Sequence, residues 1–267
     1  MTQRAHYLFI LLLFGCWPSI LLAQQDNFTD EENVEELILY NRERSAIIQM
    51  HTLGYGIAYR PGKNPTAFKT YLWNFELITM KSPKQIKIIN SLYNNSKRYV
   101  YGKLNDVFLL RGGYGLKKQL NRKPYWGGIE LRWLMEGGLS LAFEKPYYYF
   151  VVNDTEGPGG VWVQTVETKK YDDYSPLEDY IYGRAPFTRG INEIGIRPGI
   201  YLKTGLNFEF GYVKTRIKAL EAGAAVEFFP QGVNIMADNR NQRVYLTFYL
   251  SFGFGKRFNK YWDSGIE

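Results

Sequence analysis

The stretch IGIRPGIYLKTGLNFEFGY, residues 194–212, decides the fold class of this 267-residue chain. Its even positions, from Ile194 through Leu202 to Tyr212, are apolar or tolerable in lipid, whereas most odd positions are glycine, charged or amide. A β-strand places two such alternating sets on opposite faces. The run is much longer than the usual soluble strand of about 5–6 residues. It therefore indicates a strand of a larger structure than a soluble sheet.

The segment 244–255 repeats this pattern, with Val, Leu and Phe at even positions and Tyr, Thr, Ser and Gly at odd positions. In a soluble sandwich the polar faces would be a wetted exterior, but here they hold too many ionisable groups and glycines. Lipid outside and a polar lumen inside account for both faces. We therefore predict an all-β fold, a transmembrane antiparallel up-and-down β-barrel of about eight strands.

Six further segments alternate less cleanly: residues 47–59, 67–79, 108–116, 125–135, 139–151 and 217–228. Glu136-Gly137-Gly138 is interpreted as a tight turn between two of them. The alternative is one long strand through the two glycines, which gives seven strands. Bacterial single-chain barrels have even strand counts, which favours the turn and a total of eight.

The N-terminus has the features of an export signal. Arg4 precedes a 16-residue apolar stretch, Tyr7 to Leu22, and Ala23 ends a small-residue cleavage site, so residues 1–23 are predicted to be a signal peptide. A transmembrane helix needs about 20 apolar residues, and a lipid-modified Cys16 would end the apolar core instead of interrupting it. After cleavage the chain has no cysteine, and His51 is the only histidine.

Composition agrees with an exported barrel. Tyr, Phe and Gly are abundant while the mean hydropathy is slightly negative, as expected when only every second wall residue faces lipid. The net charge of +7 is a modest excess. It fits contact with anionic lipid head groups or ordinary solubility, and nucleic acid is not an expected partner of an exported protein.

The remaining boundaries follow from the pattern. Residues 24–44 are predicted to be a periplasmic lead-in with a short helix over 29–41, where Thr29 and Glu32 fit a capping box. Residues 45–258 form the barrel and 259–267 a C-terminal tail. With a periplasmic N-terminus, connections 136–138 and 212–216 are periplasmic, whereas 60–66, 118–124, 152–192 and 231–242 are extracellular. Residues 81–104 then form a periplasmic connection of unexplained length.

Charges of both signs are predicted to face the lumen: Glu76, Arg111, Glu130, Arg132, Arg197, Lys203, Glu209, Glu221 and Glu227. An eight-stranded barrel is only wide enough for side chains to fill it, and buried ions need partners. These residues therefore predict a salt-bridged plug. The alternative is a proton or ion path.

An enzymatic role is not expected. His51 falls on the apolar-parity face of its predicted strand, and no serine at a suitable spacing completes a nucleophile–base arrangement. A single histidine also lacks the ligand cluster of a metal site. We predict no catalytic, cofactor-binding or metal-binding residues and no cofactor.

The 152–192 loop mixes Asp, Glu and Lys with four tyrosines. Aromatic residues are enriched at protein contact surfaces, so this loop is expected either to bind other envelope proteins or to fold over the barrel mouth as a lid. Aromatic residues near predicted strand ends fit a girdle at the head-group level: Tyr59, Trp73, Trp126, Trp133 and Tyr212.

Four stretches carry a family resemblance: Ala23-Gln24-Gln25, Lys123 to Gly128, Tyr182 to Thr188, and Gly205 to Gly211. Together with a final strand that ends in Phe254-Gly255-Lys256-Arg257-Phe258, they resemble uncharacterised outer-membrane barrels of the Bacteroidota. The resemblance implies a barrel in the outer membrane and brings no catalytic residues. The expected function is a non-enzymatic structural or interaction barrel, including a subunit of an envelope assembly or secretion complex. A narrow channel and a lipid-modifying enzyme are the alternatives.

Overall fold

The computed structural model describes residues 40–121, 128–156, 160, 162–171, 180–211, 213, 215–239 and 241–259. These residues belong to one compact unit, Leu39–Glu267. The predicted signal peptide, the predicted helix up to residue 39 and the tail beyond residue 259 lie outside the described residues.

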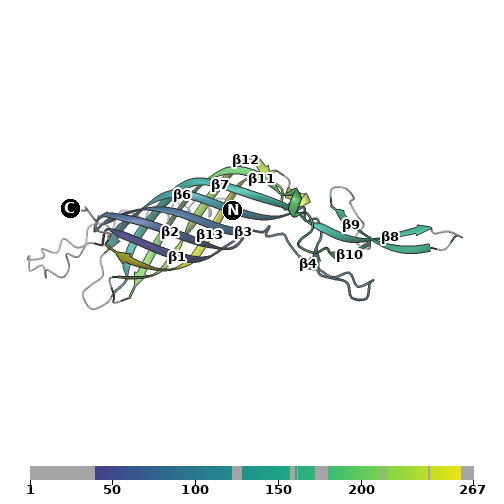
Figure 1. The fold of residues 1–267 in the computed structure, drawn as a ribbon, viewed down its shortest axis with the longest axis horizontal. Helices are drawn as coiled ribbons and strands as arrows, with labels where there is room; N and C mark the ends of the chain where they lie inside the picture. Colours follow the sequence, from purple (N-terminus) through teal and green to yellow (C-terminus); the bar gives the residue numbers. More distant parts are fainter. Residues whose placement is uncertain are drawn as a thin grey trace, which may run out of the picture. The chain divides into compact units, whose positions relative to one another are not determined.

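Eight antiparallel strands close into a barrel in the order β1-β13-β12-β11-β7-β6-β3-β2 (Figure 1). The strands are β1 (Arg42–His51), β2 (Gly54–Thr66), β3 (Lys69–Met80), β6 (Asn105–Asn121), β7 (Glu130–Pro146), β11 (Gly195–Phe210), β12 (Arg216–Val233) and β13 (Gln242–Phe258). Strands β1 and β13 close the barrel in an unbroken register from Arg42↔Phe258 to His51↔Tyr249. The predicted fold class is confirmed.

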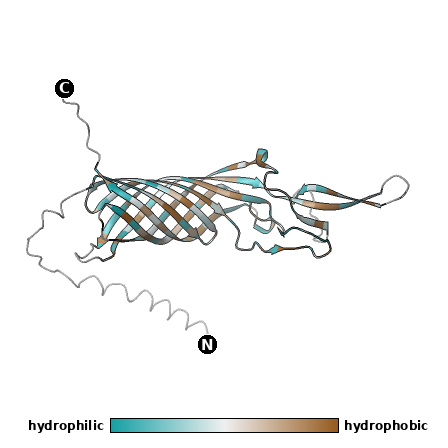
Figure 2. Cartoon of the chain, turned by 60° about the horizontal axis from the view of Figure 1, so that its bottom comes forward, coloured by the Kyte–Doolittle hydropathy of each residue, from teal (hydrophilic) through white to brown (hydrophobic). Residues whose placement is uncertain are grey.

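The alternation that predicted the strands sorts their side chains between the two surfaces of the wall. On β13, Leu246 and Phe248 are 57% and 59% exposed, whereas the intervening Thr247 and Tyr249 are buried. Figure 2 shows the same exchange of hydrophobic and hydrophilic residues along the barrel strands. Apolar residues therefore cover the outside, and most polar residues face the lumen.

The predicted strand over 47–59 is wrong. Strand β1 ends at His51 and β2 begins at Gly54, with Thr52 and Leu53 forming a two-residue turn. The Leu53 N–H donates to His51 Nδ1 at 3.3 Å, and the Thr52 N–H donates to the Phe248 carbonyl at 3.0 Å. Thr-Leu contains none of the Gly, Asn or Asp residues that usually mark a tight hairpin, so the sequence carries no signal for this turn.

The predicted turn at Glu136–Gly138 is also wrong. Strand β7 runs without interruption through these residues, and Gly138 pairs with Gly113 of β6. A Cβ on Gly138 would lie 2.2 Å from the Gly112 carbonyl oxygen, so the glycine allows close contact between strands instead of a chain reversal. The prediction missed the turn at Thr52–Leu53 and added one at Glu136–Gly138. The predicted number of eight barrel strands is therefore still correct.

These two corrections also reassign the connections. The start of β1, the end of β13, the 67–68 turn, and the 122–129 and 211–215 connections lie at one end of the barrel, here called the terminal end. The opposite end, called the loop end, carries the Thr52–Leu53 turn and residues 81–104, 147–194 and 234–241. Residues 60–66 belong to β2 and residues 118–121 to β6, so neither forms the predicted extracellular connection. The 81–104 connection lies at the same end as the 152–192 loop. Long connections gather at one end of a transmembrane barrel, so the length of residues 81–104 is no longer unexplained.

Smaller elements complete the loop end. Strands β8 (Tyr148–Glu156), β9 (Trp162–Lys170) and β10 (Ile181–Arg184) form a sheet in the order β10-β8-β9, and β4 (Lys87–Ile88) pairs with β5 (Tyr99–Val100). Two short 3-10 helices are η3 (Ile191–Glu193) and η4 (Ala237–Asn239). In the described part of the chain, no helix is both long and apolar enough to span a membrane. The barrel itself begins at Arg42, before the predicted start at residue 45.

Candidate functional site: the lumen and the loop end

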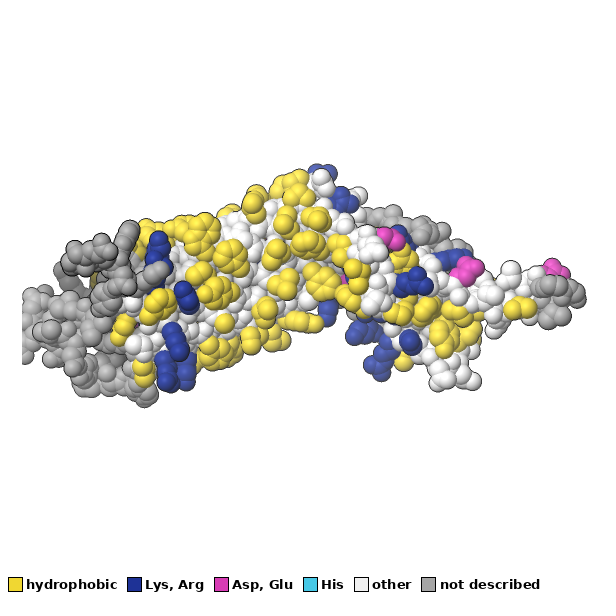
Figure 3. All heavy atoms as spheres, in the orientation of Figure 1, with side chains coloured by type: hydrophobic (Ala, Val, Ile, Leu, Met, Phe, Trp, Pro, Cys, Tyr) yellow, Lys and Arg dark blue, Asp and Glu magenta, His cyan; other side chains and the backbone are white. Residues whose placement is uncertain are grey.

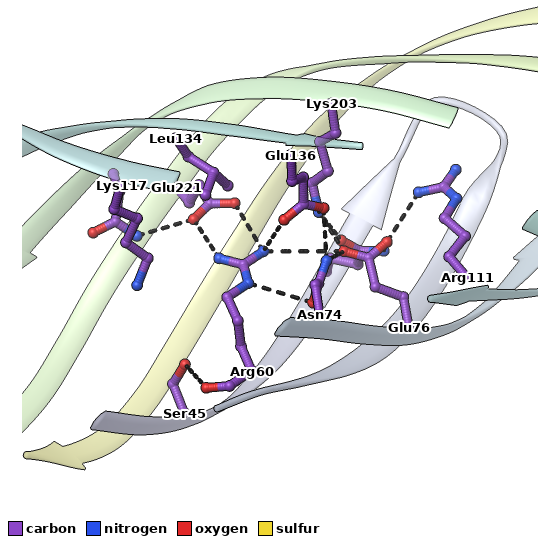
Figure 4. Close-up of polar contacts among 12 residues, drawn as sticks. Ser45, Arg60, Asn74, Glu76, Arg111, Lys117, Leu134, Glu136, Lys203 and Glu221 are labelled. Atoms are coloured by element: carbon purple, nitrogen blue, oxygen red, sulfur yellow. Dashed lines mark hydrogen bonds and ion pairs between the residues drawn. The ribbon is translucent and has the colours of Figure 1, made fainter. Parts of the chain in front are cut away.

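Seven ionisable side chains from six strands meet in the middle of the lumen. This central network consists of Glu227, which pairs with Arg111, and of six residues labelled in Figure 4: Arg60, Glu76, Arg111, Glu136, Lys203 and Glu221. All seven belong to residues with at most 5% exposure. Each belongs to the alternate residues of its strand that face the lumen. Closure of the barrel therefore brings together charges that are far apart in sequence.

Arg60 of β2 is the hub of the central network. Its guanidinium contacts Glu221 across the lumen at 2.8 Å and lies 3.7 Å from Glu136 and 4.0 Å from Glu76. Its Nε also donates to Asn74 Oδ1 at 3.4 Å. A buried charge is tolerated when ion pairs and hydrogen bonds replace its water shell, and Arg60 has both.

Glu76 of β3 joins Arg60 to the rest of the network. It accepts from Lys203 Nζ at 2.5 Å and from Arg111 at 3.0 Å. Arg111 also contacts Glu227 at 2.6 Å. These contacts link strands β3, β6, β11 and β12 across the lumen.

A second set of ion pairs fills the lumen nearer the terminal end. Lys117 contacts Glu43 at 3.0 Å, and Arg257 lies 3.5 Å from Glu43 while also pairing with Glu209. A neighbouring pair joins Arg132 and Glu130 at 2.5 Å. Charged side chains therefore occupy the lumen in two successive layers.

Toward the loop end the lumen filling becomes apolar. The buried cluster includes Ile78, Met80, Val107, Leu109, Phe229 and Tyr245. It is continued by Val233 at the end of β12 and by Ile235 and Met236 from the 234–241 connection. Close-packed apolar side chains leave few voids as large as a water molecule. Two ionic layers and one apolar layer thus fill the barrel along its length.

Most of the predicted lumen charges lie where expected. Glu76, Arg111, Glu130, Arg132, Lys203, Glu209, Glu221 and Glu227 are all buried. Arg197 differs, because it lies near the loop end with a side chain that is 34% exposed and contacts Glu144 at 3.1 Å.

The sequence analysis missed several lumen residues: Glu43, Arg60, Lys117, Glu136 and Arg257. Glu43 fell in the predicted lead-in, Arg60 in the predicted 60–66 connection, and Lys117 between the predicted strand 108–116 and the predicted connection 118–124. Glu136 fell in the false turn. Extending the period-2 pattern beyond the predicted strand ends would have found the first three. Glu136 required recognition that Gly137-Gly138 continues a strand.

His51 lies on the inward parity of β1, not on the outward face as predicted, because the chain reverses directly after it. Its Nδ1 accepts the Leu53 N–H, and its buried Nε2 has no hydrogen-bond partner among the described residues. Among the residues that the structure describes, no group of three His, Cys, Asp or Glu residues is arranged to hold a metal ion. The observed role of His51 is to stabilise the β1–β2 turn.

The base of the 147–194 connection packs against residues 99–104. Tyr149 Oη donates to the carbonyl groups of Val100 or Lys103, at 2.7 and 3.0 Å, and accepts the Lys103 N–H at 2.9 Å. Burial lowers the pKa of Lys103, while its 2.6 Å ion pair with Asp106 opposes that shift. Arg184 contacts the other Asp106 oxygen at 2.7 Å. These contacts attach the base of the 147–194 connection to residues 99–106.

Strand β9 has a different environment. It is an edge strand of its sheet, and its first six residues are exposed, including Trp162 at 68% and Val166 at 57%. Trp162 and Val166 lie on the same face because a strand alternates with period two. Trp162 and Val166 therefore form an exposed apolar pair on one face of β9.

The predicted aromatic girdle is tested at three positions. Tyr59, Trp73 and Trp133 face outward and are 46%, 57% and 39% exposed. Trp126 and Tyr212 lie outside the described residues.

No protein-family model matches the sequence, and no curated protein matches it. Among solved structures, the chain is similar to Neisserial surface protein A, with a TM-score of 0.38 and 11% identity over 81% of this chain and 96% of that chain. It is also similar to the N-terminal β-barrel domain of Pseudomonas aeruginosa OprF, with a TM-score of 0.34 and 10% identity over 80% and 96% of the two chains. A third likeness is to Ail, the attachment invasion locus protein of Yersinia pestis, with a TM-score of 0.36 and 10% identity over 82% and 100%. At these values the fold assignment rests on the strand pairing of the chain itself.

Proposed function

We propose that this protein is an exported, non-enzymatic outer-membrane β-barrel whose filled lumen does not conduct and whose loop end binds another envelope protein. Residues 1–23 would direct its export. The resemblance described above supports a relation to uncharacterised outer-membrane barrels of the Bacteroidota. The outer wall supports the membrane location, the filled lumen supports a closed barrel, and the loop end supports the interaction with a partner.

The outer wall supports a membrane location. On β13 every outward residue from Val244 to Phe254 is apolar. The ten residue steps between them cover about 33 Å of strand, which projects to about 25 Å at a barrel tilt of about 40°. This height matches the apolar band of about 25 Å on transmembrane barrels. Figure 3 shows hydrophobic side chains over the face of the barrel wall that is in view.

The filled lumen is the observation that carries the functional assignment. A water path would have to pass the apolar cluster around Phe229 and the buried pairs of Arg60 and Glu76. Opening such a path would leave buried charges without partners, at several kcal/mol for each ion. A structural or interaction role requires no such opening, so we prefer it to a channel.

Planar-bilayer recordings test this assignment. The refolded protein is expected to give no single-channel steps, because the lumen holds no continuous water path. Insertion must be measured separately, by flotation of the protein with lipid vesicles. Otherwise an absence of conductance steps that results from failed insertion could be mistaken for a closed lumen. Discrete conductance steps from a floating, folded preparation would overturn the proposal of a closed barrel.

Strand β9 supports the interaction role. An exposed edge strand offers unpaired backbone groups to an added strand, and β-strand addition is a common mode of peptide recognition. Trp162 and Val166 would supply the side-chain contacts on one face. We infer that the partner presents an extended, apolar segment to this edge.

Photo-crosslinking in intact cells tests the interaction. A crosslinking amino acid at position 166 should give one predominant product with a protein, and the Trp162→Ser variant should reduce that product. Position 248 on the outward face of β13 is the matched control and should give no such product. Equal patterns from both positions would contradict a specific contact at β9.

A further inference from the structure

The outward face of the barrel carries eight basic side chains at its terminal end. This terminal basic row consists of Arg42, Arg44, Lys63, Lys69, Lys118, Arg216, Lys218 and Lys256. Seven of them are exposed and Arg42 is partly exposed. Lys and Arg side chains are visible near this end of the wall in Figure 3.

Cross-strand pairing places several of these cations directly opposite one another. Arg42 faces Lys63, Arg44 faces Lys256, and Lys69 faces Lys118. Arg216 faces Lys256 from the other side. Like charges directly opposite on one face of a sheet are destabilising. Four such pairs therefore indicate a surface that bound anions would stabilise.

The chain supplies no anions on this surface within the part that the structure describes. The acidic residues nearest the terminal end are Glu43, Glu130 and Glu209, and all three are buried in the lumen with their own cationic partners. None of the eight basic side chains forms an ion pair with a described residue. At the loop end, by contrast, Asp106 is already paired with Lys103 and Arg184.

The position of the row identifies the class of anion. On the outward face of β13, Lys256 follows the unbroken apolar run that ends at Phe254, and on β6 Lys118 follows Leu116. A single apolar residue lies beyond each lysine, Phe258 on β13 and Leu120 on β6. The row includes residues from six of the eight strands, β1, β2, β3, β6, β12 and β13. A protein partner would engage one side of the barrel, whereas a bilayer surface surrounds it at the edge of the apolar band.

We propose that the terminal basic row binds the phosphate groups of anionic phospholipids in the leaflet at the terminal end. This inference rests on the proposed membrane location and adds a lipid preference to it. Basic residues near an anionic surface contribute on the order of 1 kcal/mol each, which corresponds to roughly fivefold in association per charge. The row would also align the barrel, because it gives the two ends of the wall different lipid partners.

The test compares phosphatidylglycerol with phosphatidylcholine around the inserted barrel. Spin-labelled lipids report the relative association of each head group with the wall. We expect wild type to prefer phosphatidylglycerol and the preference to fall with added salt. The triple variant Arg44→Gln, Arg216→Gln, Lys256→Gln should lose most of it. The control variant Lys84→Gln, Lys87→Gln, Lys97→Gln removes the same charge at the loop end and should retain the preference.

Unfolding in urea gives a second readout with opposite signs in the two lipids. Lys69→Gln removes the Lys69–Lys118 repulsion, so in phosphatidylcholine this variant should unfold at the same or a higher urea concentration than wild type. In phosphatidylglycerol it should unfold at a lower concentration, because it has lost a lipid contact. A uniform shift in both lipids would overturn the inference.

If something other than a phospholipid binds the terminal basic row, the lipid-association experiment should give a different result. If millimolar glycerol phosphate abolishes the preference, the row binds small anions instead of lipid. If the preference appears only when Glu31, Glu32, Glu35 and Glu36 are changed to Gln, the acidic N-terminal segment of the chain occupies the row. An inserted barrel without any preference would overturn the inference alone, whereas failure to insert would overturn the proposed membrane location.

Discussion

Arg60 illustrates, at the scale of a single residue, how a charge becomes structural in this barrel. Its side chain is 1% exposed and faces three carboxylates from three different strands. Removing one member of a buried ion pair costs about 3–5 kcal/mol, because the remaining charge stays buried without a partner. The energetic role of Arg60 is therefore to neutralise Glu221 and its neighbours.

We expect Arg60→Met to lower the free energy of unfolding by about 3–5 kcal/mol. Urea titration of the protein refolded in lipid vesicles measures this change. Lys84→Met is the matched control, since Lys84 is 62% exposed and lies 4.0 Å from Asp238. Such an exposed pair contributes about 0–1 kcal/mol. Equal effects of the two substitutions would contradict the central role of Arg60.

The carboxylates of the central network are not equivalent. Glu221 accepts from two nitrogens of the Arg60 guanidinium, at 2.8 and 3.3 Å. Glu136 lies 3.7 Å from both Arg60 and Lys203, and its Oε2 has no hydrogen-bond partner among the described residues. The network therefore depends more on the charge of Glu221 than on that of Glu136.

This difference predicts that Glu221→Gln destabilises the barrel by about 3–5 kcal/mol, whereas Glu136→Gln changes its stability by less than about 1 kcal/mol. Both substitutions keep the side-chain size, so the comparison isolates charge. The same urea titration measures them. A larger loss for Glu136→Gln would show that the long contacts of Glu136 matter more than the close pair of Glu221.

At the scale of strands, paired glycines allow neighbouring strands and lumen side chains to approach closely. Gly113 and Gly138 pair across β6 and β7, and Tyr201 Oη occupies the space where a Gly113 side chain would begin. Gly205 and Gly223 have the same relation to Tyr249 on the neighbouring strands β11 and β12. Tyrosine rings thus fill the volume that the glycines leave.

Gly138→Ala is expected to destabilise the barrel by about 1–3 kcal/mol, the usual effect of overpacking. Its Cβ would lie 2.4 Å from Gly113 Cα. Gly112→Ala tests the alternative that any glycine in this region is needed for flexibility. A Cβ at Gly112 meets nothing within 4 Å, so this variant should stay within about 0.5 kcal/mol of wild type. Similar losses in both variants would contradict the steric explanation.

At the scale of the whole molecule, the position of the long connections predicts the orientation of the barrel. Residues 81–104 and 147–194 lie at the loop end, opposite the start of β1 and the end of β13. Transmembrane barrels place short turns at the periplasmic side and longer loops outside. The loop end should therefore face the exterior of the cell.

Trypsin added to intact cells should cut at exposed lysines of the loop end, such as Lys84 and Lys97, and leave the barrel strands intact. Mass spectrometry of the fragments identifies the sites. The terminal basic row should be cut only after the outer membrane is permeabilised, and not readily even then because it lies in paired strands. Cleavage of Lys84 only in permeabilised cells would reverse the proposed orientation.

The fold class was predictable from the sequence. Long segments alternate with period two, and their polar faces are rich in charge, which is explained by a barrel with lipid outside and a polar lumen inside. The sequence also placed most lumen charges, including Glu76, Arg111 and Lys203, since inward parity is a local property of a strand. Only the tertiary structure decided where the chain reverses. Thr52-Leu53 turns without turn residues, and Gly137-Gly138 continues a strand because the neighbouring strand must approach closely. The partners of Arg60 likewise depended on closure of the barrel, which brings Glu221 to its guanidinium from 161 residues away.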